Sequence, residues 1–276
     1  LHDDCSLAAH YRYDLRLSLQ EPKANPTMSS GTAVHYAVEH FTLNYGGILP
    51  TDDDLEALGR ECLLDEFCND WDGPDKSVKK FLPGVLRALK RVPEWVWLGD
   101  WVSERHVEAT FYPPEHDCAS GDECLTCGVT LHGYPDIFRL RDDEGVPTVE
   151  IVDVKTTETA PLQYLLWTPQ LRMYAAVLKQ MHPNRIIIYR YLCVPTGIGK
   201  PTPEPTTFIY TEDAHAETIK EILAYASTWG EPPRPRYSRR CSWCQYKSIC
   251  MSRMTGANEE GIIRELYGQR DESTER

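Results

Sequence analysis

The sequence lacks the long apolar runs that mark membrane proteins. No stretch approaches the roughly 18 to 20 uninterrupted apolar residues of a transmembrane helix, and the N-terminal segment LHDDCSLAAHYRYDLRL is too charged for a secretory signal peptide. Internal repeats and low-complexity linkers are also missing. These absences exclude membrane-spanning and repeat proteins, and we expect a globular protein of the cytoplasm that has no membrane partner.

Basic residues are scarce as well. The 29 Lys and Arg against 42 Asp and Glu give a net charge of −13, which argues against a general nucleic-acid coat or an anionic-membrane binder. Two local runs differ from this average, because residues 232–253 hold six basic and no acidic residues and residues 76–91 also hold no acidic residue. These runs are either two solvated faces or the binding surface of one negatively charged ligand.

Cysteine, in contrast, is abundant. Ten cysteines are more than packing requires in a cytoplasmic chain, where disulfides are disfavoured, so metal binding is the better explanation. Six of them form two runs, C-x2-C-x5-C and C-x5-C-x2-C: Cys241, Cys244 and Cys250, and Cys118, Cys124 and Cys127. Cys62, Cys68 and Cys193 are expected to be buried as small apolar side chains.

Hydrophobic periodicity predicts helices first and strands later. Helices are expected from Gly31 to about residue 47, over 52–71 and over 77–91. Strands are expected over 102–112, 129–140, 149–156 and 185–194, with the second and third forming an antiparallel hairpin. Further helices are expected from Gln170 and over 213–229. This order predicts an α/β fold in which helices flank a mixed central sheet.

The chemistry is concentrated on the predicted hairpin. Asp153 and Lys155 are two residues apart on one strand and therefore share a face. Asp136, in GYPD, lies on the other arm at the depth of Asp153. Two neighbouring carboxylates suit a hard divalent cation, and a lysine beside them can orient a water or stabilise charge on a phosphate. A bare D-x-K is otherwise more often an exposed strand edge.

Three further residues could contribute to the same site. Gln170 and Tyr174 are four apart and share a helical face, from which an amide and a phenol can reach a phosphate or the lysine. His35, in GTAVH, offers an imidazole that would complete a metal site. Together the set reads G-x3-H, G-x-x-D, D-x-K and Q-x3-Y.

With these motifs the chain resembles the PD-(D/E)XK nucleases of the RecB-like exonuclease branch, specifically the iron-sulfur nucleases akin to the CRISPR-associated RecB-like exonucleases and the AddB nuclease domain. The resemblance implies a restriction-endonuclease-like core in a bacterial or phage-infected host. It implies Mg²⁺ or Mn²⁺ held by His35, Asp136, Asp153 and the carbonyl of Val154. Lys155 corresponds to the catalytic lysine, and Gln170 and Tyr174 correspond to assisting residues.

The resemblance also implies a 4Fe-4S cluster held by Cys5, Cys241, Cys244 and Cys250. Four thiolates suit zinc as well, and their spacing alone does not choose between the two metals. The insertion HDCASGDECLTC has no counterpart in the family. Cys118, Cys124 and Cys127, with His116 or His132, would bind Zn²⁺; the alternatives are a loop of thiols, or that some of these cysteines substitute for Cys5.

These observations predict one nuclease domain over residues 1–276. It would comprise a helical part at 1–100, a catalytic sheet and helix at 101–195 with a cysteine insertion at 113–128, and a C-terminal helix and cluster region at 206–255. The expected activity is metal-dependent hydrolysis of DNA, as an exonuclease on single strands or free ends. The alternative is a DNA-end-binding or assembly module with a structural cluster and little nuclease activity.

Overall fold

The computed structural model describes residues 7, 11, 15, 17–19, 26–67, 74–103, 106–113, 128–143, 145–156, 169–200, 202, 204–227, 241 and 244–269. By its internal contacts the chain divides into two compact units. One is Ala24–Ser227. The other combines Leu1–Lys23 with Thr228–Arg276, so both ends of the chain belong to the same unit.

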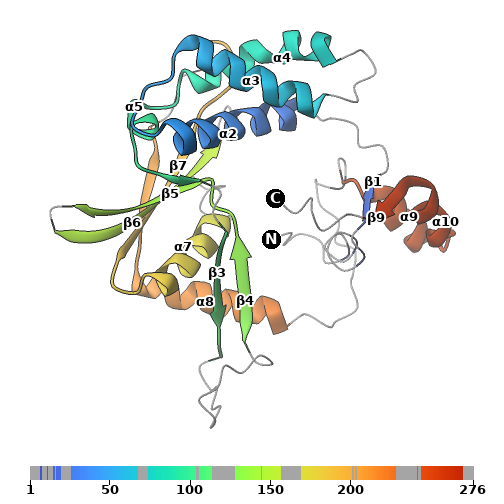
Figure 1. The fold of residues 1–276 in the computed structure, drawn as a ribbon. Coiled ribbons are helices and arrows are strands. Elements are labelled where there is room, and N and C mark those ends of the chain that lie inside the picture. Colours follow the sequence, from blue (N-terminus) through green and yellow to red (C-terminus); the bar gives the residue numbers. More distant parts are fainter. Residues whose placement is uncertain are drawn as a thin grey trace. The chain divides into compact units, whose positions relative to one another are not determined.

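The larger unit is built on a five-stranded mixed sheet (Figure 1). Its strands are ordered β2 (Val102–Ser103), β5 (Ile137–Asp143), β6 (Val146–Lys155), β7 (Ile186–Cys193) and β8 (Thr206–Tyr210). The β6–β7 pair is parallel and the other pairs are antiparallel. This sheet and its flanking helices confirm the predicted α/β fold, and the antiparallel hairpin of β5 and β6 is confirmed with it.

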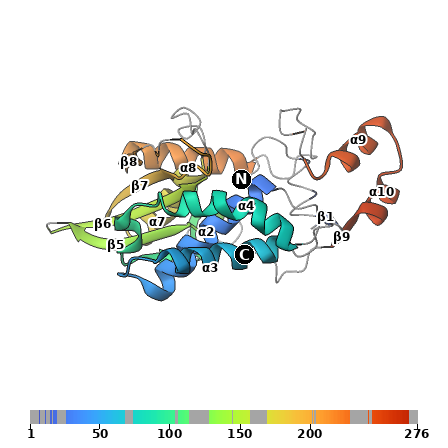
Figure 2. The same ribbon diagram turned by 90° about the horizontal axis from the view of Figure 1, so that it is seen from above.

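Four helices cover one face of the sheet: α2 (Pro26–Tyr45), α3 (Asp52–Glu66), α4 (Pro74–Leu89) and α5 (Glu94–Trp97). Their apolar stripes bury Ile137, Val152 and Val154 of the sheet in one cluster. Seen from above, α2 and α4 overlie the strands (Figure 2). A capping box fixes the start of α3, where the Thr51 hydroxyl accepts from the Asp54 amide and the Asp54 carboxylate accepts from the Thr51 amide.

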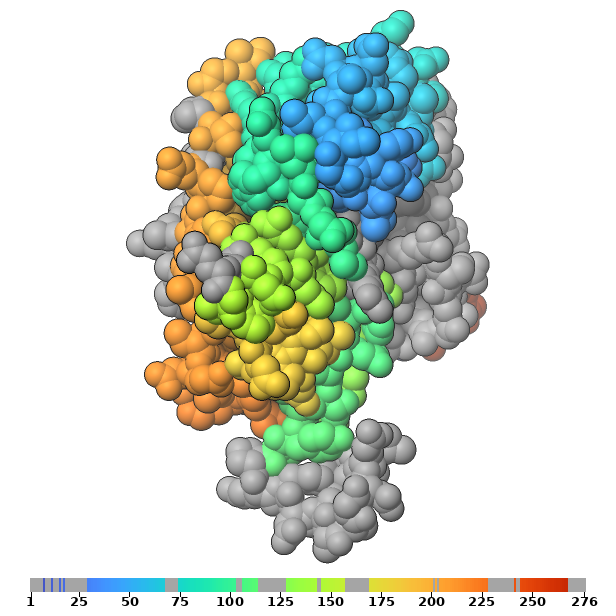
Figure 3. All heavy atoms as spheres, turned by 60° about the vertical axis from the view of Figure 1, so that its left-hand side comes forward, coloured from blue at the N-terminus to red at the C-terminus, as the bar shows by residue number. Residues whose placement is uncertain are grey.

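The other face is covered by α7 (Gln170–Met181), α8 (Glu212–Ser227) and a ribbon of β3 (Val107–Phe111) and β4 (Val129–Gly133). Since α7 connects the parallel strands β6 and β7, these three elements form a β-α-β unit. Figure 3 shows the layers in succession, with α2 and α3 in blue, the β5–β6 hairpin in lime and α7 in yellow. No helix in the described ranges is long and apolar enough to cross a membrane.

Two of the predicted strands are wrong in extent. The strand expected over 102–112 is divided into β2 and β3, and the one expected over 129–140 is divided into β4 and β5. Tyr134, Pro135 and Asp136 separate β4 from β5, and proline cannot donate a ladder hydrogen bond. As a result, β3 and β4 pair with each other outside the main sheet. The sequence analysis also missed β8, and α2 begins at Pro26 rather than at Gly31.

The smaller unit joins the two ends of the chain. Strand β1 (Leu17–Leu19) pairs antiparallel with β9 (Tyr267–Gln269), beside α9 (Lys247–Thr255) and α10 (Glu259–Leu266). Leu7 and Tyr11 share a buried cluster with Tyr246 and Ile249. The Tyr246 hydroxyl donates to the carbonyl of Leu17 at 2.9 Å. The N-terminal segment is therefore part of the core around the C-terminal cysteine run.

A buried acidic residue ties three strands of the main sheet together. The Glu150 side chain on β6 is only 1% exposed and accepts from Arg139 of β5 at 2.8 Å and from Arg190 of β7 at 2.5 Å. The Arg139 guanidinium also lies over the Trp101 ring, 4.2 Å from its centroid. Burial alone raises the pKa of Glu150, but the hydrogen bonds and charges of Arg139 and Arg190 outweigh it, so its pKa lies below the ordinary 4.5.

Replacing Glu150 with Gln should lower the free energy of unfolding by about 3 kcal/mol at neutral pH, because two half-buried guanidinium groups lose their counter-ion. Since the folded-state pKa is depressed, this difference from wild type should be full above the ordinary value of 4.5 and shrink as the pH falls below it. Urea unfolding at several pH values measures it. Glu217→Gln, which removes an exposed ion pair with Lys220, should cost less than about 1 kcal/mol. Equal losses in the two variants would contradict this role of Glu150.

Candidate active site

Asp153 and Lys155 lie together at the carboxyl end of β6. Their side chains share a face, as the spacing predicts, and Lys155 Nζ donates to Asp153 Oδ1 at 2.9 Å. Asp153 Oδ2 is 2.7 Å from the same nitrogen, yet it is buried and accepts no well-aligned hydrogen bond from the described residues. The end of this strand thus holds a buried carboxylate with one oxygen left for a further partner.

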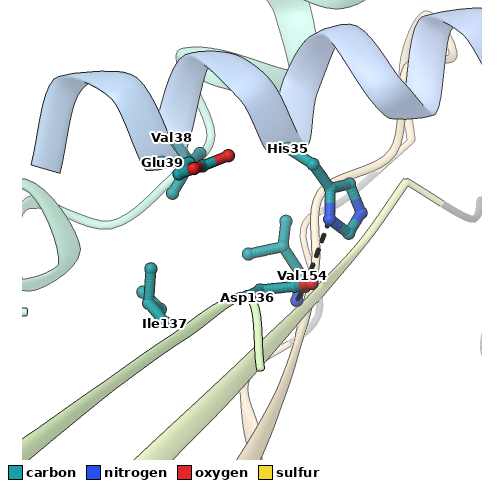
Figure 4. A pocket seen from close by; sticks show the side chains of 6 residues that line it. All are labelled: His35, Val38, Glu39, Asp136, Ile137 and Val154. Atoms are coloured by element: carbon teal, nitrogen blue, oxygen red, sulfur yellow. Dashed lines mark hydrogen bonds and ion pairs between the residues drawn. The ribbon is translucent and has the colours of Figure 1, made fainter. Parts of the chain in front are cut away.

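Asp136 lies opposite Asp153 on the other arm of the hairpin. Ile137 pairs with Val152, so the preceding residue of the β5 arm comes beside Asp153. Asp136 Oδ2 accepts from the Val154 amide at 2.8 Å and lies 3.1 Å from His35 Nδ1. Figure 4 shows His35 reaching from α2 to this carboxylate. One carboxylate therefore joins a helix to the central strand.

A close approach between α2 and β6 positions His35. A Cβ on Gly31, one turn before His35, would lie 3.1 Å from Thr156 Oγ1, which is tighter than ordinary contact. Glycine lets the helix come this close to the end of β6. The Gly31 and His35 spacing thus places the imidazole over the carboxylates.

The charges of these groups depend on one another. Burial and the neighbouring Asp136 charge together raise the pKa of Asp153 to about 6, against the lowering effect of Lys155. Burial also acts to raise the pKa of Asp136, but the hydrogen bond and charge of His35 bring it below its usual range. Burial disfavours the charged Lys155, yet the Asp153 carboxylate raises its pKa. The site thus places two carboxylates of unequal basicity side by side.

Helix α7 contributes Gln170 and Tyr174 to the same end of the sheet. Lys155 Nζ lies 3.5 Å from Gln170 Oε1, a long hydrogen bond. Burial raises the pKa of the Tyr174 phenol, while a hydrogen bond with Gln170 lowers it. A Cβ on Gly133 would lie 2.6 Å from Tyr174 Cε1, so the absence of a side chain at the end of β4 makes room for this ring.

Glu39 is a neighbour of the site that the sequence analysis missed. It lines a small pocket with His35, Val38, Asp136, Ile137 and Val154 (Figure 4). Glu39 is four residues after His35 on α2, so both side chains project from one face of the helix. The H-x3-E spacing was the available signal for a third carboxylate residue that lines this pocket.

The donor set fits a hard divalent cation. Carboxylate oxygens are typical ligands of Mg²⁺ and Mn²⁺, and the unsatisfied buried oxygen of Asp153 is a suitable one. In the described structure these groups instead contact each other and Lys155, and no three His, Cys, Asp or Glu of the described ranges are arranged to hold a metal. A cation would therefore have to displace part of the His35 to Asp136 contact.

The cysteine predictions have mixed outcomes. Cys62 and Cys193 are buried, as expected, and burial raises the pKa of Cys62 to about 12. Cys244 and Cys250 pack against the buried cluster of the smaller unit, and Cys241 is half-buried. Other cysteine and histidine positions of the analysis lie outside the described residues: Cys5, Cys68, His116, Cys118, Cys124 and Cys127. His132 is on β4.

Two arginines of the basic run 76–91 have a structural role. Arg87 Nε donates to the carbonyl of Thr196 at 3.0 Å, and Arg91 donates to the carbonyls of Pro195 and Gly197. Both side chains hold the loop that follows β7. Lys90, although exposed, pairs with Asp52 at 2.7 Å. The hypothesis that this run binds a negatively charged ligand therefore concerns mainly the exposed Lys76, Lys79 and Lys80.

Gly133→Ala should lower the free energy of unfolding by about 1 to 3 kcal/mol, because the new methyl group overlaps the Tyr174 ring. In a Tyr174→Ala background the same substitution should cost much less, and a double-mutant cycle measures this coupling. Gly84→Ala in α4 is the control, since a Cβ there would meet Thr196 and Arg87 only at ordinary contact distances. An equal cost of Gly133→Ala in both backgrounds would rule out the overlap with Tyr174.

Searches of curated sequences and of solved structures give only distant similarities. No curated protein sequence matches the chain. Among solved structures it is similar to SSO0001, with 13% identity, a TM-score of 0.35 and coverage of 81% of this chain and 96% of the other. It is also similar to a protein described as a "putative exonuclease" from Eubacterium rectale, with 11% identity, a TM-score of 0.36 and coverage of 83% and 94%.

The family comparison is decisive. Residues 2–251 match the model described as the PD-(D/E)XK nuclease superfamily. Together with the mixed sheet, this match confirms the predicted restriction-endonuclease-like fold. Because it covers far more than half of the 276 residues, the chain belongs to the PD-(D/E)XK nuclease superfamily.

Proposed function

We propose that this protein is a metal-dependent deoxyribonuclease of the RecB-like iron-sulfur branch that acts as an exonuclease on single strands or free DNA ends. The observation that carries the proposal is the meeting of Asp136, Asp153 and Lys155 at one end of the β5–β6 hairpin, with His35 against the first carboxylate. The motif set GTAVH, GYPD, DVK and QLRMY supports the choice of branch.

His35, Asp136 and Asp153, with the Val154 carbonyl, would hold the divalent cation. When bound, Mg²⁺ or Mn²⁺ supplies positive charge to the phosphate oxygens and acidity to water. The protein's own contribution is orientation. Asp136 and Asp153 are fixed by the hairpin register, and the Val154 amide and His35 hold the Asp136 carboxylate in place.

Lys155 would act directly on the substrate. Its ammonium group is held beside Asp153 and within 3.5 Å of Gln170 Oε1, and it can donate to a phosphate oxygen or to the attacking water. Tyr174, on the next turn of α7, lies beside Gln170. We propose that Gln170 and Tyr174 position Lys155 and the adjoining phosphate.

The iron-sulfur part of the proposal rests on the smaller unit. Cys241 is half-buried, and Cys244 and Cys250 pack against a cluster that includes Leu7. The Leu7 position is two residues after Cys5 in the sequence, which supports Cys5 as the fourth ligand. Zn²⁺ on His116, Cys118, Cys124 and Cys127 is the corresponding proposal for the insertion.

Asp153→Asn and Lys155→Ala should each lower cleavage of end-labelled DNA with Mn²⁺ by at least about 100-fold, because both groups serve the reacting phosphate. Single-stranded and double-stranded substrates with either end labelled report strand preference and direction of cutting. Asp142→Asn, an exposed aspartate at the far end of the same hairpin, is the control. Wild-type rates in either site variant, with circular dichroism unchanged, would eliminate this site, whereas DNA-end binding without cleavage by the wild-type protein would favour a DNA-end-binding module.

Anaerobically purified protein should be brown and contain iron, and Cys244→Ala should lose both the colour and thermal stability, because ligand binding also stabilises the fold. Cys62→Ala, which changes a buried thiol of the larger unit, should keep the iron. Iron and zinc are measured together by plasma mass spectrometry. Zinc without iron in active protein would show that the C-terminal cysteines hold a structural zinc.

A further inference from the structure

The β3–β4 ribbon presents a group of rings on its outer face. His106, His132 and Tyr134 are all exposed. The His106 ring centroid lies 5.7 Å from that of His132 and 5.4 Å from that of Tyr134, which is the range of aromatic contacts. We call these three residues the ring cluster.

Strand alternation explains why the rings face outward. Val107 and Phe111 on β3 are buried on the side of α7, and Ala109 packs against the same cluster, so the alternate residues Glu108 and Thr110 point to the opposite face. His132 pairs with Glu108, and the next step of the register brings Tyr134 opposite His106. The ribbon is therefore apolar on the side of α7 and carries polar and aromatic groups on its other side.

The ring cluster adjoins the candidate active site along the chain. Tyr134 precedes Asp136 by two residues, a backbone distance of at most about 7 Å. Gly133, between His132 and Tyr134, lies next to the Tyr174 ring, because a Cβ added to it would be 2.6 Å from Tyr174 Cε1. This distance is about that of one or two stacked nucleotides, for which the rise along one strand is about 3.4 Å.

The chemistry of the ring cluster selects a base rather than a phosphate. Glu108 shares its face and lies 3.9 Å from His106 Nε2, and this carboxylate would repel a phosphate. Exposed rings instead provide a surface on which a nucleobase can stack. In a duplex the faces of each base are covered by its neighbours, so the cluster fits a base that has left the stack.

We infer that the ring cluster binds an unpaired nucleobase close to the phosphate that is cleaved. The inference rests on the proposed function and narrows its substrate to single strands or frayed ends. Tyr134 supplies the surface on which the base stacks. His106 packs against the Tyr134 ring and against His132, and so holds the ring cluster together. The role assigned to these residues is substrate binding and not the chemical step.

Binding without cleavage tests the inference. Fluorescence anisotropy with a labelled single-stranded oligonucleotide and with a blunt duplex, both in EDTA, gives the two affinities. Tyr134→Ala should weaken single-strand binding by about 5- to 100-fold, the range expected for one stacked base, and should change duplex binding less than about twofold. Tyr134→Trp should retain the single-strand affinity. Tyr45→Ala, an exposed tyrosine at the end of α2, is the matched control.

Two results would overturn the inference. One is an unchanged single-strand affinity in Tyr134→Ala, and the other is an equal loss of affinity for single-stranded and duplex DNA. If Tyr134→Ala lowers the melting temperature, the His106→Ala variant is measured in its place. That variant must then also lose affinity for the single strand and not for the duplex. The proposed function fails separately, when wild-type protein with Mn²⁺ does not cut DNA, because the binding measurement uses no metal and no turnover.

Discussion

The Asp136 carboxylate is the contact on which the site depends. It accepts from the Val154 amide of the central strand and lies against His35 of α2, so it connects the sheet to the helical layer above it. Its charge also acts on Asp153, whose pKa burial and this neighbour raise. Without this carboxylate the imidazole would lose its partner and the two layers would lose a polar contact at the end of the hairpin. The Asp136 side chain therefore has a structural role in joining the two layers and a proposed role as a ligand of the divalent cation.

One face of β6 carries a buried ion-pair network that stabilises the sheet, and the other face carries residues of the candidate active site. Glu150, with its arginines, lies on the side of the helical layer and holds three strands together. Asp153 and Lys155 project to the side of α7, where Gln170 and Tyr174 lie. Both sets are charged groups in a largely buried strand, and each is tolerable because an opposite charge lies within hydrogen-bond distance. The difference is that Asp153 keeps an oxygen with no aligned donor in the described structure, as a ligand site requires.

Hydrophobic periodicity predicted the elements whose form depends on nearby residues in the sequence. The alternation of Asp153 and Lys155, the hairpin of β5 and β6 and the helix that begins at Gln170 followed from periods of two and of 3.6 residues. The interruption at Pro135 could not be predicted in this way, because the residues on both sides of it favour strands. Only the tertiary pairing of β3 with β4 reveals that the chain leaves one sheet for another at this point. Glu39 was missed because a glutamate on a helix is usually solvated, and its place in the pocket that Asp136 also lines depends on how α2 packs. The pairing of β1 with β9 spans almost the whole chain and has no short-range signal.

The central claim is that the carboxylates of the β5–β6 hairpin bind the divalent cation with which the protein cuts DNA. Titration of Mn²⁺ followed by electron paramagnetic resonance, with cleavage measured in the same samples, tests it most directly. The account predicts saturable Mn²⁺ binding in the wild type that rises together with cleavage, and the loss of both in Asp136→Asn. Undiminished Mn²⁺ affinity and cleavage in Asp136→Asn, with the fold intact, would contradict it.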